Sequence, residues 1–185
     1  MDKMQPGAEV EIELAYLPKW LPEELSTVTP TRIADVYISS EADLLTKLRL
    51  RQNGQRFELT KKVVLDPSDL SVQQEYNTPL TAEEFEKLRA VDGREVIKDR
   101  YVFDIDGHRA EMDIFLGRLA GFCLVEFEFN SVEAKEKFVP PVFCGPEVTQ
   151  EDFIAGAYLA GKSYQDVEND LVRLDYTALH HETQS

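Results

Sequence analysis

The 185-residue chain lacks an apolar run of about 18 residues, the length that a membrane-spanning helix needs. Its N-terminus has neither the basic nor the apolar region of a signal peptide. Cysteine is scarce, and Cys123 and Cys144 stand outside any Cys-x-x-Cys pair or zinc-type cluster. These absences predict a cytoplasmic protein with free thiols and no contact with a membrane.

Basic residues are few: 20 Lys and Arg stand against 35 Asp and Glu, which gives a net charge of −15. This excess opposes general binding to nucleic acid or anionic membranes, because both are polyanions. An anionic ligand would therefore need a locally basic pocket. The length and the 43% hydrophobic content predict one globular domain over residues 1–185, with a core at about 8–175 and a loose tail at 176–185.

Alternating polar and apolar residues predict a chain that consists mainly of strands. The clearest is Glu-Val-Glu-Ile-Glu-Leu at 9–14, with one acidic and one aliphatic face. Two hairpins are expected, around Asn53-Gly54 and around Asp106-Gly107, since both dipeptides favour tight turns. The expected strands cover residues 9–14, 33–39, 45–51, 56–64, 95–104, 108–116 and 122–130.

Helices are expected between and after these strands. Thr81, with Glu84 three residues later, predicts a capping box and a helix to about Arg89, ended by Asp92-Gly93. We expect this helix to cover the mouth of a barrel. Further helices are expected from residue 22, over 131–138, and over 150–174 with a break near Gly161.

Ionisable side chains recur at alternate positions of most predicted strands, which places them on one face of each strand. Taken singly, each could be the solvated face of an antiparallel sheet. Taken together, acidic strands beside basic strands favour polar faces that converge inside a closed barrel. There the acids would require divalent cations and the bases a polyanion, and a metal-bound triphosphate would satisfy both.

Several of these segments, in this order, resemble the CYTH, or triphosphate tunnel metalloenzyme, family. They are Glu11-Ile-Glu13, Leu48-Arg49-Leu50-Arg51, Glu58 to Lys62, Glu75 to Leu80, Lys98-Asp-Arg100, Glu111-Met-Asp113 and Glu126-Phe-Glu128. The resemblance implies an α+β fold: an eight-stranded antiparallel closed β-barrel with flanking helices and a C-terminal helix at the tunnel. It also raises a homodimer as an option.

The resemblance further implies roles for individual residues. The triphosphate-binding residues would be Arg49, Arg51, Lys62, Lys98 and Arg100. The ligands of Mg²⁺ or Mn²⁺ would be Glu11, Glu13, Asp113, Glu126 and Glu128, since hard oxygen ligands suit these ions. Glu128 and Tyr37 would also serve in catalysis.

One position departs from the family pattern. The signature reads Glu-x-Glu-x-Lys, but this chain has Ala15 where the lysine is expected. In some members that lysine is thought to act beside a tyrosine, here Tyr37. Either Lys19 or Lys47 could supply the missing charge.

The resemblance to inorganic triphosphatases implies a metal-dependent triphosphatase that hydrolyses inorganic tripolyphosphate to pyrophosphate and phosphate. Conversion of ATP to cyclic AMP, as in class IV adenylate cyclases, and hydrolysis of thiamine triphosphate are alternatives. A third is a non-catalytic module that binds triphosphate or polyphosphate, because Ala15 replaces the lysine.

Overall fold

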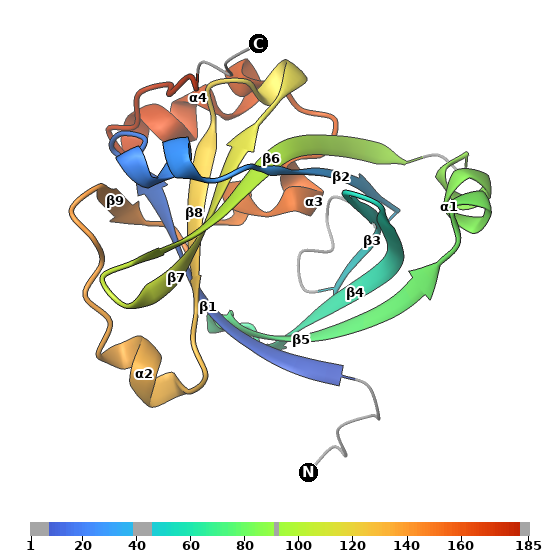
Figure 1. Cartoon of the computed structure of the whole chain (residues 1–185), viewed down its shortest axis with the longest axis horizontal. Coiled ribbons are helices and arrows are strands. Elements are labelled where there is room, and N and C mark those ends of the chain that lie inside the picture. Colours follow the sequence, from blue (N-terminus) through green and yellow to red (C-terminus); the bar gives the residue numbers. More distant parts are fainter. Residues whose placement is uncertain (1–7, 39–45, 91–92, 182–185) are drawn as a thin grey trace.

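A closed antiparallel β-barrel dominates the computed structural model, which describes residues 8–38, 46–90 and 93–181 (Figure 1). Within these ranges, eight strands follow the order β5-β4-β3-β2-β6-β7-β8-β1, and pairing of β5 with β1 closes the ring. A further strand, β9, pairs antiparallel with the Tyr16–Pro18 end of β1. The strands are β1 (Ala8–Pro18), β2 (Thr31–Tyr37), β3 (Thr46–Asn53), β4 (Arg56–Asp66), β5 (Asp69–Leu80), β6 (Arg94–Ile105), β7 (His108–Phe115), β8 (Cys123–Glu128) and β9 (Cys144–Glu147).

Both predicted hairpins form, but the turn of the first differs by one residue. Asp106 and Gly107 have φ values of 51° and 79°, as a two-residue turn of the predicted kind requires. In the first hairpin Asn53 pairs with Arg56 as part of the ladder, so Gly54 and Gln55 form the turn. Gly54 supplies the positive φ of 60° at the first turn position, and Asn53 is therefore a strand residue.

Strand β5 was not predicted, because its pattern is the reverse of the usual one. Its buried side chains are Ser71, Gln73 and Glu75, whereas the aliphatic Val72 between them is only half-buried. Polar residues are buried here because they face the inside of the barrel. A search for buried apolar residues therefore misses this strand.

Helix α1 (Ala82–Arg89) has the predicted capping box between Thr81 and Glu84. The helix was expected to cover a barrel mouth, but it lies on the outer side of the wall instead (Figure 1). Its buried Phe85 packs against Val36 and Leu50. Asp92, the predicted end signal, lies outside the described residues, as do Ser39 and Leu45 at the ends of two predicted strands.

The C-terminal region packs beside the barrel as short segments rather than one long helix. They are η3 (Asp152–Ile154), α3 (Gly156–Leu159) and α4 (Tyr164–Arg173), and the predicted break falls at Gly161, whose φ is 81°. Shorter elements elsewhere are η1 (Glu23–Thr27), η2 (Gly117–Leu119) and α2 (Val132–Glu136). Within the described ranges, none of the helices has the length and apolar character that crossing a bilayer requires.

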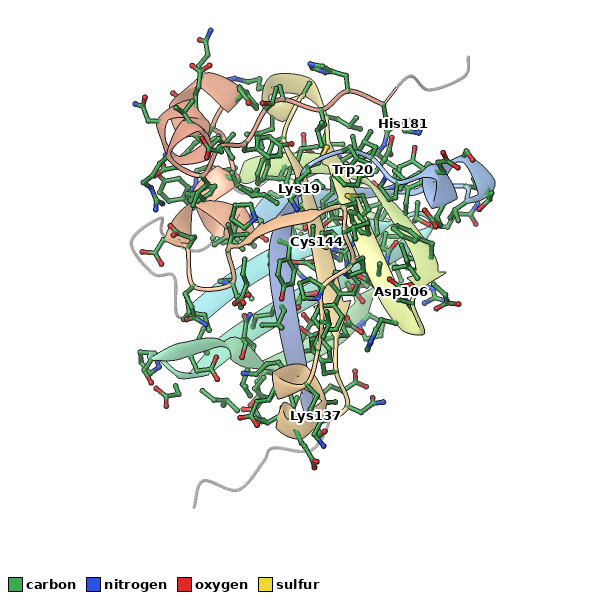
Figure 2. All side chains as sticks on the ribbon, turned by 90° about the vertical axis from the view of Figure 1, so that its left-hand side faces the viewer. Lys19, Trp20, Asp106, Lys137, Cys144 and His181 are labelled. Carbon is green, nitrogen blue, oxygen red and sulfur yellow. The ribbon has the colours of Figure 1, made fainter. Side chains whose placement is uncertain are left out.

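The expected loose tail is instead attached to the barrel as far as His181. The Tyr176 hydroxyl donates to the Gly121 carbonyl and accepts from the Cys123 amide, both at 2.8 Å. His181 stacks near Tyr101, with ring centroids 5.3 Å apart, at the outer surface (Figure 2). Burial of aromatic rings therefore orders residues whose composition alone suggested a frayed end.

Most hydrophobic packing lies between the wall and the elements outside it. The largest cluster packs Phe122 and the Leu159 region of α3 against Val167 and Leu171 of α4. The same cluster reaches the inside of the barrel at one end, through Ala15, Tyr37, Val96, Phe115 and Leu124. A second lies around Phe127, Phe143 and Met112 beneath β9 and α2. Charged and polar side chains line the rest of the barrel interior.

Candidate functional site

The barrel encloses a cavity of about 230 Å³ whose walls are strongly charged. The carboxylates are Glu11, Glu13, Asp35, Glu75, Glu111, Glu126, Glu128, Glu151 and Asp152, and the bases are Lys47, Arg49, Arg51, Lys62, Lys98 and Arg100. Acids therefore exceed bases on the lining. The polar faces of the strands converge on the interior, as the barrel interpretation predicted, rather than facing solvent.

The two-residue period of the strands positions these side chains. Glu11 and Glu13 point inward from β1, as Arg49 and Arg51 do from β3. Every predicted site residue lines the cavity except Asp113, which is fully buried in the wall beside it.

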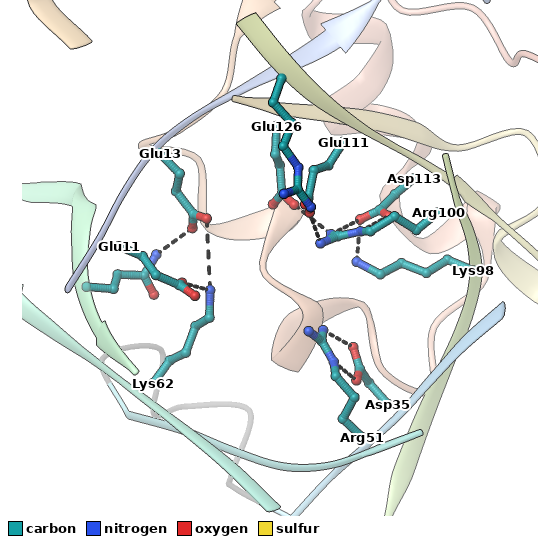
Figure 3. A network of polar contacts seen from close by, with 12 residues as sticks. Glu11, Glu13, Asp35, Arg51, Lys62, Lys98, Arg100, Glu111, Asp113 and Glu126 are labelled. Carbon is teal, nitrogen blue, oxygen red and sulfur yellow. Dashed lines mark hydrogen bonds and ion pairs between the residues drawn. The ribbon is translucent and has the colours of Figure 1, made fainter. Parts of the chain in front are cut away.

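Asp113 is the centre of a buried ion-pair network (Figure 3). Its Oδ1 accepts from Arg100 Nε at 2.7 Å, and its Oδ2 accepts from Arg100 Nη2 at 2.6 Å and also from Lys98 Nζ. Arg100 reaches Glu126 at 2.8 Å and also pairs with Glu111. Burial favours a raised pKa for Asp113, but the charges of Arg100 and Lys98 outweigh it and hold the pKa at about 2.

A second group surrounds Arg49 and Arg51 on β3. Arg51 forms a two-pronged pair with Asp35, at 2.7 and 2.8 Å (Figure 3). Arg49 Nη1 donates to the Tyr37 hydroxyl at 3.2 Å, and Arg49 Nη2 lies 3.6 Å from Glu75 Oε2. Burial opposes ionisation of Asp35, yet the two arginines hold the pKa of this carboxyl well below its usual range.

Lys62 neutralises the acidic strand across the tunnel. Its ammonium pairs with Glu11 and lies 3.9 Å from Glu13 (Figure 3). It also lies 3.3 Å from Glu75. Burial by itself would lower the pKa of Lys62, but Glu13 and Glu11 outweigh it and the pKa is raised.

Other acids of the lining are less well compensated. Burial raises the pKa of Glu13 despite Lys62, and the charges of Glu126 and Glu11 raise it further. Burial also raises the pKa of Glu128, and Glu111 and Glu11 add to this. Glu128 has no hydrogen bond or ion pair with any residue in the described ranges. These acids would be stabilised by an added cation.

Three buried side-chain atoms of the described residues have no hydrogen-bond partner, and all three belong to the tunnel: Arg49 Nε, Gln73 Oε1 and Glu75 Oε2. A native protein leaves few such atoms without a partner. One is a donor and two are acceptors. The tunnel therefore has unused capacity for an anion and for a cation together.

The oxygen donors of the tunnel fit a hard divalent cation in kind. Glu11 and Glu13 on β1 stand near Glu126 and Glu128 on β8, where Glu13 is the cross-strand partner of Glu128. In this structure no three described acids, histidines or cysteines lie close enough together to hold a metal ion. The carboxylates would thus have to converge on binding. Asp113 has both oxygens engaged by Lys98 and Arg100.

The segment at 149–156 closes one end of the tunnel, beside Ala15 and Tyr37. The Ala15 amide donates to Thr149 Oγ1 at 3.0 Å, and Gly156 packs against the Tyr37 hydroxyl. Lys19 lies outside the tunnel, where its ammonium donates to the Val142 carbonyl (Figure 2). Lys19 therefore cannot supply the charge that Ala15 lacks.

Sequence reasoning gave no role to several tunnel residues, including Asp35, Gln73 and Glu75, and named Lys47 only as one of two lysines that could replace the charge missing at position 15. Glu75 lies in a segment that the family resemblance covered, and Asp35 lies two residues before Tyr37. Lys47 continues the alternation of Arg49 and Arg51, which was a usable signal. Gln73 carried no such signal, because an uncharged residue in an unpredicted strand stands out only after the barrel closes.

Known proteins with a similar sequence or structure follow the same architecture. The chain is 37% identical over 143 residues to the inorganic triphosphatase of Nitrosomonas europaea, and the match covers 76% of this chain and 90% of that protein. A crystal structure of an inorganic triphosphatase matches with a TM-score of 0.60 and 32% identity, over 82% of this chain and 98% of that one. No protein-family model matches.

A more distant match shares the fold alone. A Bacillus halodurans protein that has been suggested to be an adenylate cyclase has a TM-score of 0.52 at 14% identity. The match covers 96% of each chain.

Proposed function

Since the chain belongs to the CYTH, or triphosphate tunnel metalloenzyme, family, we propose that its tunnel is the active site of a metal-dependent inorganic triphosphatase. The substrate is tripolyphosphate, and the products are pyrophosphate and phosphate. The observation that carries the proposal is the closed tunnel with opposite charges on facing walls, in which buried donors and acceptors remain unpaired. The Nitrosomonas europaea relative, an inorganic triphosphatase, supports the same activity.

The size and character of the cavity favour a small inorganic substrate. Its volume of about 230 Å³ lies below the roughly 300–1,000 Å³ typical of sites for drug-sized organic ligands. Charged side chains form most of its lining, and the segment at 149–156 closes one end. A nucleoside or thiamine moiety therefore has no evident pocket among the described residues.

The bases of the tunnel bind the phosphoryl groups. Arg49 and Arg51 on β3 face Lys98 and Arg100 on β6 across β2, so a linear anion between them meets positive charge along its length. Guanidinium groups suit this task because their planar donors match two phosphate oxygens at once. Lys62 adds a point charge from β4.

The carboxylates of β1 and β8 are the proposed holders of Mg²⁺ or Mn²⁺. Glu11, Glu13, Glu126 and Glu128 supply the oxygen donors, whereas Asp113 holds Lys98 and Arg100 in position. A bound divalent ion would neutralise phosphate charge and lower the pKa of a coordinated water. Glu128, which forms no hydrogen bond or ion pair with a described residue, would accept a proton from the attacking water.

The test is phosphate release from tripolyphosphate, ATP and thiamine triphosphate, each with Mg²⁺, with Mn²⁺ or with a chelator. We expect metal-dependent release from tripolyphosphate far above that from the other two substrates. The exposed Glu23→Gln variant should behave as the natural protein does. Cyclic AMP formation from ATP is measured in parallel. Tight binding of tripolyphosphate without release would identify a binding module and contradict the proposal.

A further inference from the structure

Lys47 differs from the other bases of the tunnel. Arg49, Arg51, Lys62, Lys98 and Arg100 each pair with at least one carboxylate. Lys47 lines the same cavity, but it forms no hydrogen bond or ion pair with any described residue. Among the six bases of the lining, Lys47 is therefore the one whose ammonium has no ion pair with a carboxylate of the described residues.

The strand register explains why Lys47 lacks a partner. It points inward from β3 directly opposite Lys62 on β4, so its nearest cross-strand neighbour has the same charge. Lys62 in turn pairs with Glu11, Glu13 and Glu75, whereas none of these carboxylates forms an ion pair with Lys47. The two ammonium groups repel each other, and an anion that both contact would relieve this repulsion.

The charges around Lys47 show which part of the lumen its ammonium occupies. Lys62 and Arg49 repel this ammonium, whereas the carboxylates of Glu13 and Glu126 attract it. Glu13 is two residues before Ala15 on β1, and Glu126 is the cross-strand partner of Ala15 on β8. Lys47 therefore serves the part of the lumen into which a longer side chain at position 15 would project.

The burial of Lys47 argues against an idle surface lysine. Burial and the charge of Lys62 lower the pKa of Lys47 to about 8, so the folded protein holds this ammonium in an unfavourable setting. An ordinary lysine would extend into water and avoid that setting. A side chain held at such a position contributes to ligand binding more than to stability.

We propose that Lys47 contacts the triphosphate and binds a phosphoryl oxygen near the end of the tunnel that residues 149–156 close, where Ala15 provides no charge. This inference rests on the proposed function. The positively charged side chain at this end of the tunnel then comes from β3, through Lys47, rather than from position 15 on β1. Ala15 and Lys47 line the same cavity, and the methyl group of Ala15 adds no charge to it.

The experiment compares Lys47→Ala with Lys61→Ala, a matched control on the outward face of the adjacent strand. We expect Lys47→Ala to raise KM for Mg²⁺-tripolyphosphate by about 10-fold or more, the loss typical of a charge-assisted hydrogen bond. The melting temperature should not fall, because Lys47 has no described partner to lose. Lys61→Ala should leave KM unchanged.

A second variant tests the relocation itself. Adding Ala15→Lys to Lys47→Ala places an ammonium in the same subsite from β1, and KM should return toward that of the natural protein. Calorimetric titration with Mg²⁺-tripolyphosphate gives the same comparison as a dissociation constant, independently of turnover. If the natural protein hydrolyses tripolyphosphate and Lys47→Ala has an unchanged KM and dissociation constant, the Lys47 inference is wrong while the proposed function stands. If the natural protein neither binds nor hydrolyses tripolyphosphate, both are wrong.

Discussion

Gly156 packs against the hydroxyl of Tyr37 so closely that a β-carbon at position 156 would overlap the phenol oxygen. Tyr37 is buried and also accepts a hydrogen bond from Arg49. The start of α3 thereby restrains the tyrosine, and the tyrosine restrains Arg49, one of the residues proposed to bind phosphate. A residue remote in sequence is thus coupled to the charged lining by one steric contact.

Gly156→Ala is expected to destabilise the protein by about 1–3 kcal/mol, the usual cost of overpacking. It should also lower kcat/KM, because displacement of Tyr37 moves Arg49. Urea unfolding and steady-state kinetics measure the two effects. The double variant Gly156→Ala/Tyr37→Phe removes the oxygen that clashes most and should lose less stability than the sum of the single variants. Strict additivity would contradict the contact.

Glu128→Gln is expected to separate function from folding. Burial and neighbouring acids raise the pKa of Glu128, so removing its charge should leave the free energy of unfolding unchanged or higher at neutral pH. Metal-dependent kcat/KM should fall by about 100-fold, the upper range for loss of a group that supports a metal. The control is Glu9→Gln, because Glu9 lies on the acidic face of the neighbouring strand β1 but outside the tunnel lining. Equal activity in the two variants would remove Glu128 from the proposed site.

Acid should unfold the protein through Asp35 and Asp113. Both have a folded-state pKa below the unfolded value of about 3.9, so their stabilisation is complete above that pH. It is lost as the pH falls from about 4 toward about 2. Asp113→Asn should already cost about 3–5 kcal/mol at neutral pH, because Lys98 and Arg100 lose a buried partner.

Urea unfolding at several pH values tests this prediction, with the exposed Asp104→Asn as control. Glu13 and Glu128 act in the opposite direction: their folded-state pKa values are raised, so the stabilisation from their protonated forms is lost as the pH rises above about 4.3. Stability should therefore pass through a maximum in mildly acidic solution. A natural protein whose stability is constant between pH 4 and 2 would refute the role of the two aspartates.

Tyr176→Phe tests the attachment of the C-terminal segment. Its hydroxyl bonds to Gly121 and Cys123, and removing it leaves a buried carbonyl and a buried amide without a partner. The expected cost is about 1–3 kcal/mol in urea unfolding. Tyr158→Phe, at a tyrosine whose hydroxyl has no described hydrogen bond, should cost much less. Equal losses in the two variants would mean that the segment is not held by the hydroxyl.

The sequence alone predicted the barrel because strands leave a period-two pattern wherever one face is polar and the other apolar. It missed β5, where the polar face is buried and the pattern carries Gln73 and Ser71 at core positions. It placed the first hairpin turn at Asn53-Gly54, although the ladder extends through Asn53 and the turn is Gly54-Gln55. Local propensity located the turn, and the pairing register decided its residues.

The charged side chains of the site were also predictable, but their pairing was not. Alternation places Lys98, Arg100 and Asp113 on inward faces, and only the register of β6 with β7 brings all three together. The same holds for the opposition of Lys47 to Lys62. The pairing register decides which bases are neutralised by a carboxylate and which remain available for a ligand. The sequence of one strand does not reveal its register with the next strand.

The hydrophobic packing of this protein lies mainly between the strands and the helices, and it enters the lumen only at the end lined by Ala15, Tyr37, Val96, Phe115 and Leu124, whereas the rest of the lumen contains the charges. Away from that end, folding and ligand recognition draw on different sets of side chains. Under the proposal for Lys47, a lumen cation on one strand replaces a cation on another, with little effect on the apolar contacts that hold the wall. Such a scaffold is well suited to adaptation, since its selectivity can change without rebuilding its core.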